Sequence, residues 1–132
     1  MKYIIKKETK PTLATFGKYK AVASHHHTIG HDQIIEECCR PGIFTADIVE
    51  PVLIRLSDVI NRHLRNGDKV KIKDFGMMKL EIESEKVDDP KTFRAKKHIR
   101  GVRLHFLPES YEGTQALYDG ITFEKDKTFK EE

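Results

Sequence analysis

The residues with the clearest chemical potential form a run of cations that ends at Arg103. The run contains no acid, and its members, with His98 among them, are Lys91, Arg94, Lys96, Lys97, Arg100 and Arg103. Repeated lysine and arginine side chains along a two-stranded ribbon neutralise the phosphates of a nucleic acid and release its counterions. The run therefore predicts a surface that contacts a polyanion.

The segment before this run is acidic, and its charged side chains, relieved by Lys86, are Glu81, Glu83, Glu85, Asp88 and Asp89. In a bulge-free ribbon, alternation gives one face to Arg94, Lys96, His98 and Arg100. The opposite face then holds Glu81, Glu83 and Glu85. Gly101 indicates a bulge or twist that would change this arrangement. Alternatively, the opposite charges pair across the ribbon and only keep it folded and soluble.

Three strands must position these charges. After the Asn66-Gly67-Asp68 turn, Val70 and Ile72 alternate with lysines. A second strand follows Asp74-Phe75-Gly76 and turns Met78, Leu80 and Ile82 to one face, and a third contains Val102, Leu104 and Phe106. On the solvent face of this sheet we expect the cations Lys69, Lys71, Lys73, Lys79 and Arg103.

Two amphipathic helices precede the sheet. The first is expected from His31 to Arg40, with an apolar stripe of Ile34, Ile35, Cys38 and Cys39. Burial as small hydrophobic residues is favoured over a redox role for the two cysteines. The second begins after Thr45 as N-cap and carries the stripe Ile48, Val49, Val52, Leu53, Leu56, Val59, Ile60 and Leu64. Pro51 implies either a kink or a regular helix that starts near Glu50.

The two ends of the chain predict additional strands. Tyr3–Lys7 and Lys18–Ala23 are expected to pair as a hairpin whose lysines, Lys2, Lys6, Lys7, Lys18 and Lys20, form either an ordinary solvated strand face or an auxiliary basic surface. A short helix is expected after Pro108 over Thr114–Tyr118. A final strand over Ile121–Phe123 then precedes a charged tail.

Other chemistry has little support in the sequence. His25, His26, His27 and His31 offer four imidazoles, but consecutive side chains on an extended segment diverge, so a polar loop is favoured over a metal site. Asp74-Phe75-Gly76 also occurs in protein kinases, yet the chain has no glycine-rich nucleotide loop and no catalytic His-Arg-Asp segment. We therefore expect no enzyme activity, no cofactor, no bound metal and no small-molecule substrate.

Length and composition limit the class of protein. A chain of 132 residues with 38% apolar content can bury one core, and its net charge of +3 permits a polyanionic partner without requiring one. The N-terminus lacks the apolar core of a signal peptide, and no segment approaches membrane-spanning length. Two adjacent cysteines do not make a disulfide framework. We therefore expect a cytoplasmic protein.

The order of helix, turn, Phe-Gly strand and arm, carried by Gly67–Gly76, resembles the bacterial HU and integration-host-factor family. The resemblance covers roughly Gly30 to Leu117, and the extended ends are similar to HU-like proteins of the Bacteroides group. It implies an α+β fold with two N-terminal helices, a three-stranded antiparallel sheet, a protruding β-ribbon arm, a short C-terminal helix and extra terminal strands. The implied domains are an N-terminal extension (1–29), an HU-like DNA-binding domain (30–118) and a C-terminal strand and tail (119–132).

The resemblance also implies a function. The chain would form a homodimer through its second helix and sheet, and would bend double-stranded DNA with arms in the minor groove, largely independently of sequence. Pro90 falls where the family has its arm-tip proline, and an apolar tip can separate a base step, so Pro90 and Phe93 are expected to be the wedge residues. The expected location is the cytoplasmic nucleoid. The alternative is an HU-like structural or protein-interaction module with weak or no DNA binding.

Overall fold

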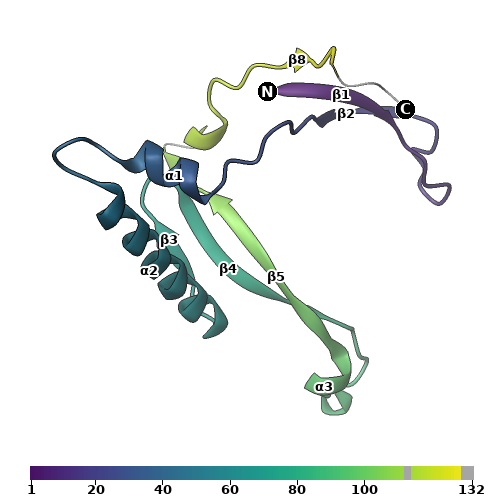
Figure 1. The fold of residues 1–132 in the computed structure, drawn as a ribbon. Coiled ribbons are helices and arrows are strands. Elements are labelled where there is room, and N and C mark those ends of the chain that lie inside the picture. Colours follow the sequence, from purple (N-terminus) through teal and green to yellow (C-terminus); the bar gives the residue numbers. More distant parts are fainter. Residues whose placement is uncertain (112–113, 129–132) are drawn as a thin grey trace. The chain divides into compact units, whose positions relative to one another are not determined.

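The computed structural model describes residues 1–111 and 114–128, and its elements are shown in Figure 1. The chain divides into two units, one formed by Met1–Ile34 with Gly120–Glu132 and the other by Ile35–Asp119. The domain boundaries expected at residues 29/30 and 118/119 stay predictions. Among the described residues, no helix is long and apolar enough to cross a membrane.

An antiparallel sheet of order β3-β4-β5 is the centre of the unit Ile35–Asp119. Its strands are β3 (Val70–Ile72), β4 (Gly76–Ser84) and β5 (Ile99–Pro108). Because side chains alternate across a strand, the register places on one face the apolar residues Val70, Met78, Leu80, Ile82, Val102, Leu104 and Phe106. The opposite face carries charged residues, among them Lys71, Lys79, Glu81, Arg103 and His105. The three predicted strands and their alternation are confirmed.

A tight turn joins β3 to β4. Asp74 adopts a left-handed conformation with φ 65°, and the Phe75 N–H donates to the Ile72 carbonyl at 3.1 Å. Gly76 follows and is buried. A Cβ added to Gly76 would lie 2.7 Å from the Phe106 ring and closer still to the Leu107 carbonyl oxygen. A residue without a side chain is therefore needed for β5 to approach β4 at this point.

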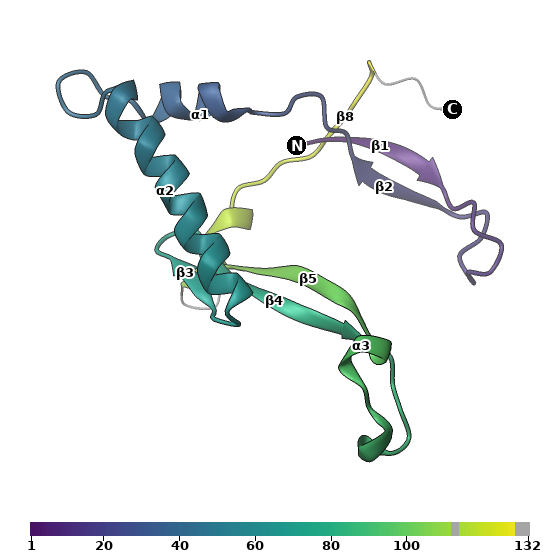
Figure 2. The ribbon, with the colours of Figure 1, turned by 60° about the horizontal axis from the view of Figure 1, so that its bottom comes forward.

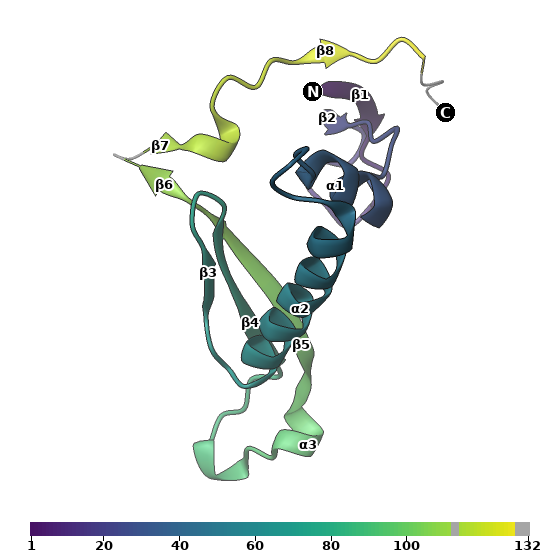
Figure 3. The same ribbon diagram turned by 60° about the vertical axis from the view of Figure 1, so that its left-hand side comes forward.

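The two predicted helices are present with altered ends. Helix α1 spans His31–Cys38, two residues fewer than predicted, and α2 spans Ala46–Arg65 with Pro51 inside it. The alternative in which the regular helix starts near Glu50 is therefore wrong. Thr45 occupies the N-cap position, but its hydroxyl donates to the Asp47 carboxylate instead of accepting a backbone N–H. Figures 2 and 3 show α2 lying along the sheet, where it contacts β3 and β4.

Helix α2 buries only part of its apolar stripe. Leu64 is buried, and Leu53 is half-buried. In contrast, Ile48, Val52 and Leu56 are 52%, 59% and 43% exposed. Since an α-helix turns by about 100° per residue, these three residues lie within one narrow sector beside the covered sector. Helix α2 thus keeps an apolar face that its own chain leaves uncovered in the described structure.

The segment after the sheet differs from its prediction. Pro108 is the last residue of β5 and does not start a helix. Strands β6 (Ser110–Tyr111) and β7 (Thr114–Gln115) pair antiparallel, and η2, a single 3-10 turn, spans Ala116–Tyr118. The helix predicted over Thr114–Tyr118 is therefore reduced to its last three residues.

The unit formed by Met1–Ile34 and Gly120–Glu132 is built on the predicted N-terminal hairpin. Strand β1 (Lys2–Lys7) pairs antiparallel with β2 (Tyr19–Ala23), and β8 (Glu124–Lys125) pairs parallel with β1. The strand predicted over Ile121–Phe123 is wrong, because these residues have no regular structure and the strand that joins the hairpin is β8, directly after them. The strand order β2-β1-β8 joins the two ends of the chain in one sheet.

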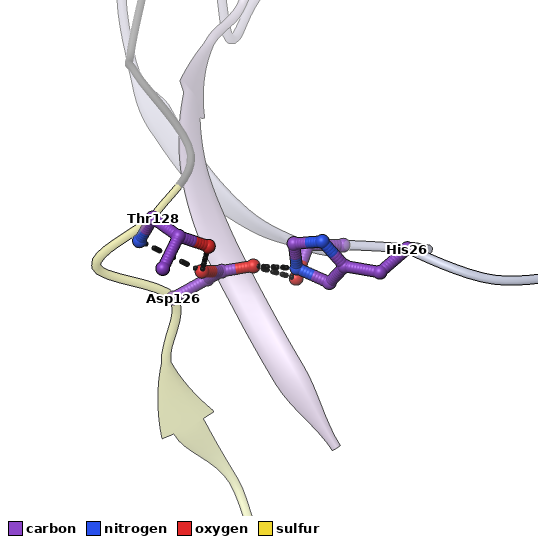
Figure 4. Close-up of polar contacts among 4 residues, drawn as sticks. His26, Asp126 and Thr128 are labelled. Carbon is purple, nitrogen blue, oxygen red and sulfur yellow. Dashed lines mark hydrogen bonds and ion pairs between the residues drawn. The ribbon is translucent and has the colours of Figure 1, made fainter.

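A buried carboxylate holds this unit together (Figure 4). Asp126 is only 4% exposed. Its Oδ1 accepts from the N–H and hydroxyl of Thr128 at 3.0 and 2.7 Å, and its Oδ2 accepts from the Ser24 hydroxyl at 2.8 Å and contacts the His26 ring. The Thr128 hydroxyl, followed by Ser24, lowers the pKa of Asp126 well below its usual value. The ionised carboxylate thus links the C-terminal segment to the end of the hairpin.

We expect Gly76→Ala to destabilise the protein, because the new methyl group meets backbone and a packed ring. Overpacking of this kind costs about 1–3 kcal/mol. The change is measured as a lower midpoint of urea unfolding. Gly101→Ala is the matched control, since a Cβ there meets nothing within 4 Å. Equal midpoints for the two variants would contradict the close approach of β5 to Gly76.

We expect Asp126→Asn to lower the melting temperature at pH 7 and to make the melting temperature less sensitive to acid pH. The pKa of the folded carboxyl lies below the reference value of 3.8, so its contribution is present above about pH 4 and is lost as the pH falls further. The difference in melting temperature from wild type should therefore shrink between about pH 4 and pH 2. Glu124→Gln, an exposed neighbour on β8, is the control. A constant difference across this range would exclude an ionised Asp126 as the stabilising group.

Candidate nucleic-acid interface

The arm is a two-stranded stem with a folded tip. The stem is formed by β4 and β5, and between Ser84 and Ile99 lie the 3-10 turn η1 (Pro90–Thr92) and the short helix α3 (Ala95–His98). Figure 1 shows α3 at the end of the β4–β5 ribbon. The extended ladder predicted for Arg94, Lys96, His98 and Arg100 is therefore wrong.

Local hydrogen bonds explain why the tip folds into turns. The Asp89 carboxylate accepts the Lys91 N–H at 3.0 Å at the start of η1. The ring nitrogen Nδ1 of His98 accepts the Arg94 N–H at 2.8 Å, and the His98 N–H donates to the Arg94 carbonyl at 2.8 Å. Side chains thus satisfy backbone groups that would otherwise need cross-strand partners.

Two of the predicted contact residues take part in this local structure. The Arg94 guanidinium donates to the Lys91 and Phe93 carbonyls, each at 2.9 Å. The Phe93 ring lies 5.3 Å from the His98 ring and is half-buried. Pro90, in contrast, is exposed at the first position of η1. Pro90 is therefore the more accessible of the two predicted wedge residues.

A β-bulge lies where the stem meets the tip. Glu83 pairs with Gly101 and Ser84 with Ile99, which leaves Arg100 as the extra residue. The bulge anticipated near Gly101 is confirmed. As expected for a ribbon with a bulge, the bulge-free arrangement is changed: the Arg100 guanidinium donates to the Glu85 carboxylate at 3.1 Å.

Acids neutralise the cations of the stem. Glu81 accepts from Arg103 at 3.0 Å and lies 3.7 Å from both Lys79 and His105. The Arg103 hydrogen bond lowers the pKa of Glu81. On the same face, the Lys71 ammonium lies 3.4 Å from the Glu109 carboxylate. The net charge that the stem offers to a polyanion is therefore small.

Four lysines outside these pairs lie at the tip. Among the described residues, no salt bridge involves the exposed side chains of Lys86, Lys91, Lys96 and Lys97. Lys69 and Lys73, which flank β3, are likewise exposed and outside the ion pairs found in the described chain.

The predicted contact residues do not include two basic residues that the structure places on the arm, Lys86 and His105. Lys86 lies within the acidic segment of the sequence, but the structure places it at the tip with the other lysines. His105 alternates with Arg103, and this two-residue spacing is the signal that could have placed it on the charged face beside Glu81.

The cysteines and histidines do not form a competing site. Cys38 is exposed and Cys39 half-buried, so the predicted burial of Cys38 is wrong. Within residues 1–111 and 114–128, no group of three or more histidine, cysteine or acidic side chains is arranged to hold a metal ion. His26 instead contacts the buried Asp126.

Comparison with known proteins identifies one family. The family model described as "HU domain fused to wHTH, Ig, or Glycine-rich motif" matches residues 1–125. The match includes the N-terminal hairpin and β8 as well as the helices, sheet and arm. No curated protein and no solved structure matches the chain. Since the match covers nearly all of the sequence, the chain belongs to the HU-HIG family of HU-domain proteins.

Proposed function

We propose that this protein is a histone-like, architectural protein that binds and bends double-stranded DNA, largely independently of sequence, without catalysis. HU-type proteins form a DNA-binding, non-enzymatic family, to which the chain belongs. The observation that carries the proposal is the cluster of exposed lysines at the arm tip, beside an exposed proline. This role would place the protein on the nucleoid in the cytoplasm.

The proposed contacts differ in strength along the arm. Lys91, Lys96 and Lys97 can approach phosphates without first breaking an ion pair. Lys79, Arg100 and Arg103 must exchange a carboxylate partner for a phosphate, which reduces their net contribution. We therefore assign most of the arm's phosphate binding to the tip, with Lys69, Lys71 and Lys73 as weaker contacts near β3.

Pro90 is the proposed wedge in the minor groove. It is exposed, it has no N–H to leave unpaired, and its ring is fixed by the η1 turn. An apolar wedge of this kind unstacks a base step and kinks the duplex. Phe93 instead supports the tip through its contact with His98. Bending is thus assigned mainly to Pro90 and affinity mainly to the lysines.

A homodimer is part of the proposal, because a single copy leaves much apolar surface uncovered. In the described residues of the unit Ile35–Asp119, only Ile35 and Leu64 are buried hydrophobic side chains. The apolar face of the sheet is also partly uncovered, since Ile82 and Val102 are 65% and 61% exposed. Full burial of one such side chain stabilises by about 1.5–3 kcal/mol, so a second copy placed on α2 and the sheet would supply the missing core.

The DNA proposal is tested by titrating a fluorescent duplex of about 30 base pairs across salt concentrations. We expect wild-type affinity to fall steeply with salt. A triple alanine variant at Lys91, Lys96 and Lys97 should bind more weakly, with a log–log slope shallower by about 0.9 for each lost phosphate contact. The matched control removes three exposed cations from α2, at Arg55, Arg62 and Arg65, and should change the slope less.

Two further variants sharpen this experiment. Glu81→Gln should raise affinity, because it releases the stem cations Lys79 and Arg103 from their acid partner. Pro90→Ala should keep the salt slope but reduce the bend, measured by energy transfer between dyes at the duplex ends. Absence of wild-type binding even at low salt would reject DNA binding and favour the alternative of a protein-interaction module.

The dimer proposal predicts that Val52→Glu dissociates the protein, because the new carboxylate would be buried in the interface without a partner. Sedimentation should give a dimer for wild type and a monomer for the variant. The wild-type melting temperature should also rise with protein concentration. Arg65→Glu, on the same helix but about 100° from the nearest residue of the exposed apolar sector, is the control. A wild-type monomer at all concentrations would exclude the dimer.

A further inference from the structure

The positive charge of this chain is concentrated in its N-terminal hairpin. The segment 30–118 contains 15 basic and 15 acidic side chains and thus has no formal net charge. The segment Lys2–Ala23 contains six lysines and a single acid, Glu8. This hairpin segment alone has a formal charge of +5, whereas the whole chain has +3. The HU-like segment is therefore electrically balanced, and the hairpin is not.

The strand register gathers four of these six lysines on one side of the hairpin, Lys2 at the start of β1 and three near the loop. Lys6 lies directly opposite Lys20, and the Glu8 N–H donates to the Lys18 carbonyl at 2.8 Å, which makes Glu8 and Lys18 the next facing pair. We call Lys6, Lys18 and Lys20 the hairpin lysine face. Alternation places all three on the same side of the two-stranded ribbon.

The charges of the hairpin lysine face are only weakly compensated. Glu8 shares this side of the ribbon and lies 3.8 Å from the Lys20 ammonium. On the neighbouring strand β8, Glu124 lies beside Lys2 on the same side, at the end of the sheet away from the hairpin lysine face. The Lys20 side chain remains 65% exposed. Like charges placed directly opposite each other destabilise an antiparallel pair, so the Lys6–Lys20 pair costs stability in the isolated chain. An anionic partner would remove this repulsion.

The other face of the hairpin is different in character. Tyr3, Ile5 and Ala21 line an apolar pocket there, together with Phe123. The lysine side also carries the facing pair Ile4 and Val22, and Ile4 is buried. The cationic part of that side is therefore the end of the hairpin near its loop, where Lys6, Lys18 and Lys20 lie. Lysines on a flat strand face act as point charges and have no pocket with which to read base edges, which suits contact with a regular phosphate backbone.

We propose that the hairpin lysine face is a second DNA-binding surface, which contacts the phosphates of the same duplex that the arm engages. This inference rests on the proposed DNA-binding function and extends it to the unit outside the HU-like segment. Because both surfaces belong to one chain, binding of one raises the effective concentration of DNA at the other. The hairpin then supplies the attractive charge that the balanced HU-like segment lacks.

The test uses the full chain and the same salt titration on duplex DNA. Replacing Lys6, Lys18 and Lys20 with alanine should weaken binding and make the log–log slope shallower, by up to about 2.7 for three phosphate contacts. Replacing the same three lysines with arginine retains the charge and should retain the slope. The triple alanine variant of the arm tip is measured in parallel.

Lys6→Glu separates binding from folding. It places an acid opposite Lys20, so its melting temperature should equal or exceed that of wild type, while its affinity for DNA should fall. A variant that bound less because it had unfolded would show the opposite change in melting temperature.

The outcomes are distinguishable. If wild type binds and the hairpin alanine variant has an unchanged affinity and slope, the second surface is overturned while the arm proposal stands. If wild type does not bind duplex DNA at any salt concentration, the proposed function fails and this inference fails with it. If the hairpin variant loses affinity for vesicles with anionic headgroups but not for DNA, the face binds membranes and the inference is overturned.

Discussion

The pairing of β4 with β5 is the interaction on which the rest of the larger unit depends. Its register assigns every side chain of the two strands to the apolar or the charged face, and a slip of one residue would exchange the faces. Gly76 allows β5 to approach at one end of the pairing. At the other end the bulge at Arg100 interrupts it and begins the tip. The same pairing therefore defines the surface for α2, the ion pairs of the stem and the point where the arm changes structure.

The register also explains why the number of basic residues overstates the cationic character of the arm. Glu81 lies opposite Arg103 and next to Lys79, so the stem satisfies its charges internally. The tip differs from the stem. The Asp89 and His98 side chains accept backbone N–H groups there, and most of the tip lysines are exposed to solvent. Charge available to a partner is thus determined by where strand pairing ends.

Periodicity predicted the elements that long-range packing stabilises. The alternation of Val70 with its lysines identifies the sheet, and the apolar stripe of α2 identifies that helix. The tip was mispredicted, because helix α3 depends on a specific acceptor, His98 Nδ1, and period-two charge patterns carry no signal for it. Exposure of Cys38 was missed for a related reason: a stripe shows which residues share a face, and not how far the face is covered.

The balance of charge between the two units has a consequence for affinity. Phosphate binding by lysine is weak for each contact and depends on salt, so a segment with equal numbers of acids and bases gains little from the long-range field. A protein can offset this by distributing its cations over several surfaces that bind the same polymer. Binding of one surface raises the effective concentration of the polymer at the next. In this chain the cationic surfaces are the arm tip and the hairpin lysine face, and a homodimer would double both. Affinity then depends on how many surfaces engage at once and would fall steeply with salt, even though the HU-like segment itself has no net charge.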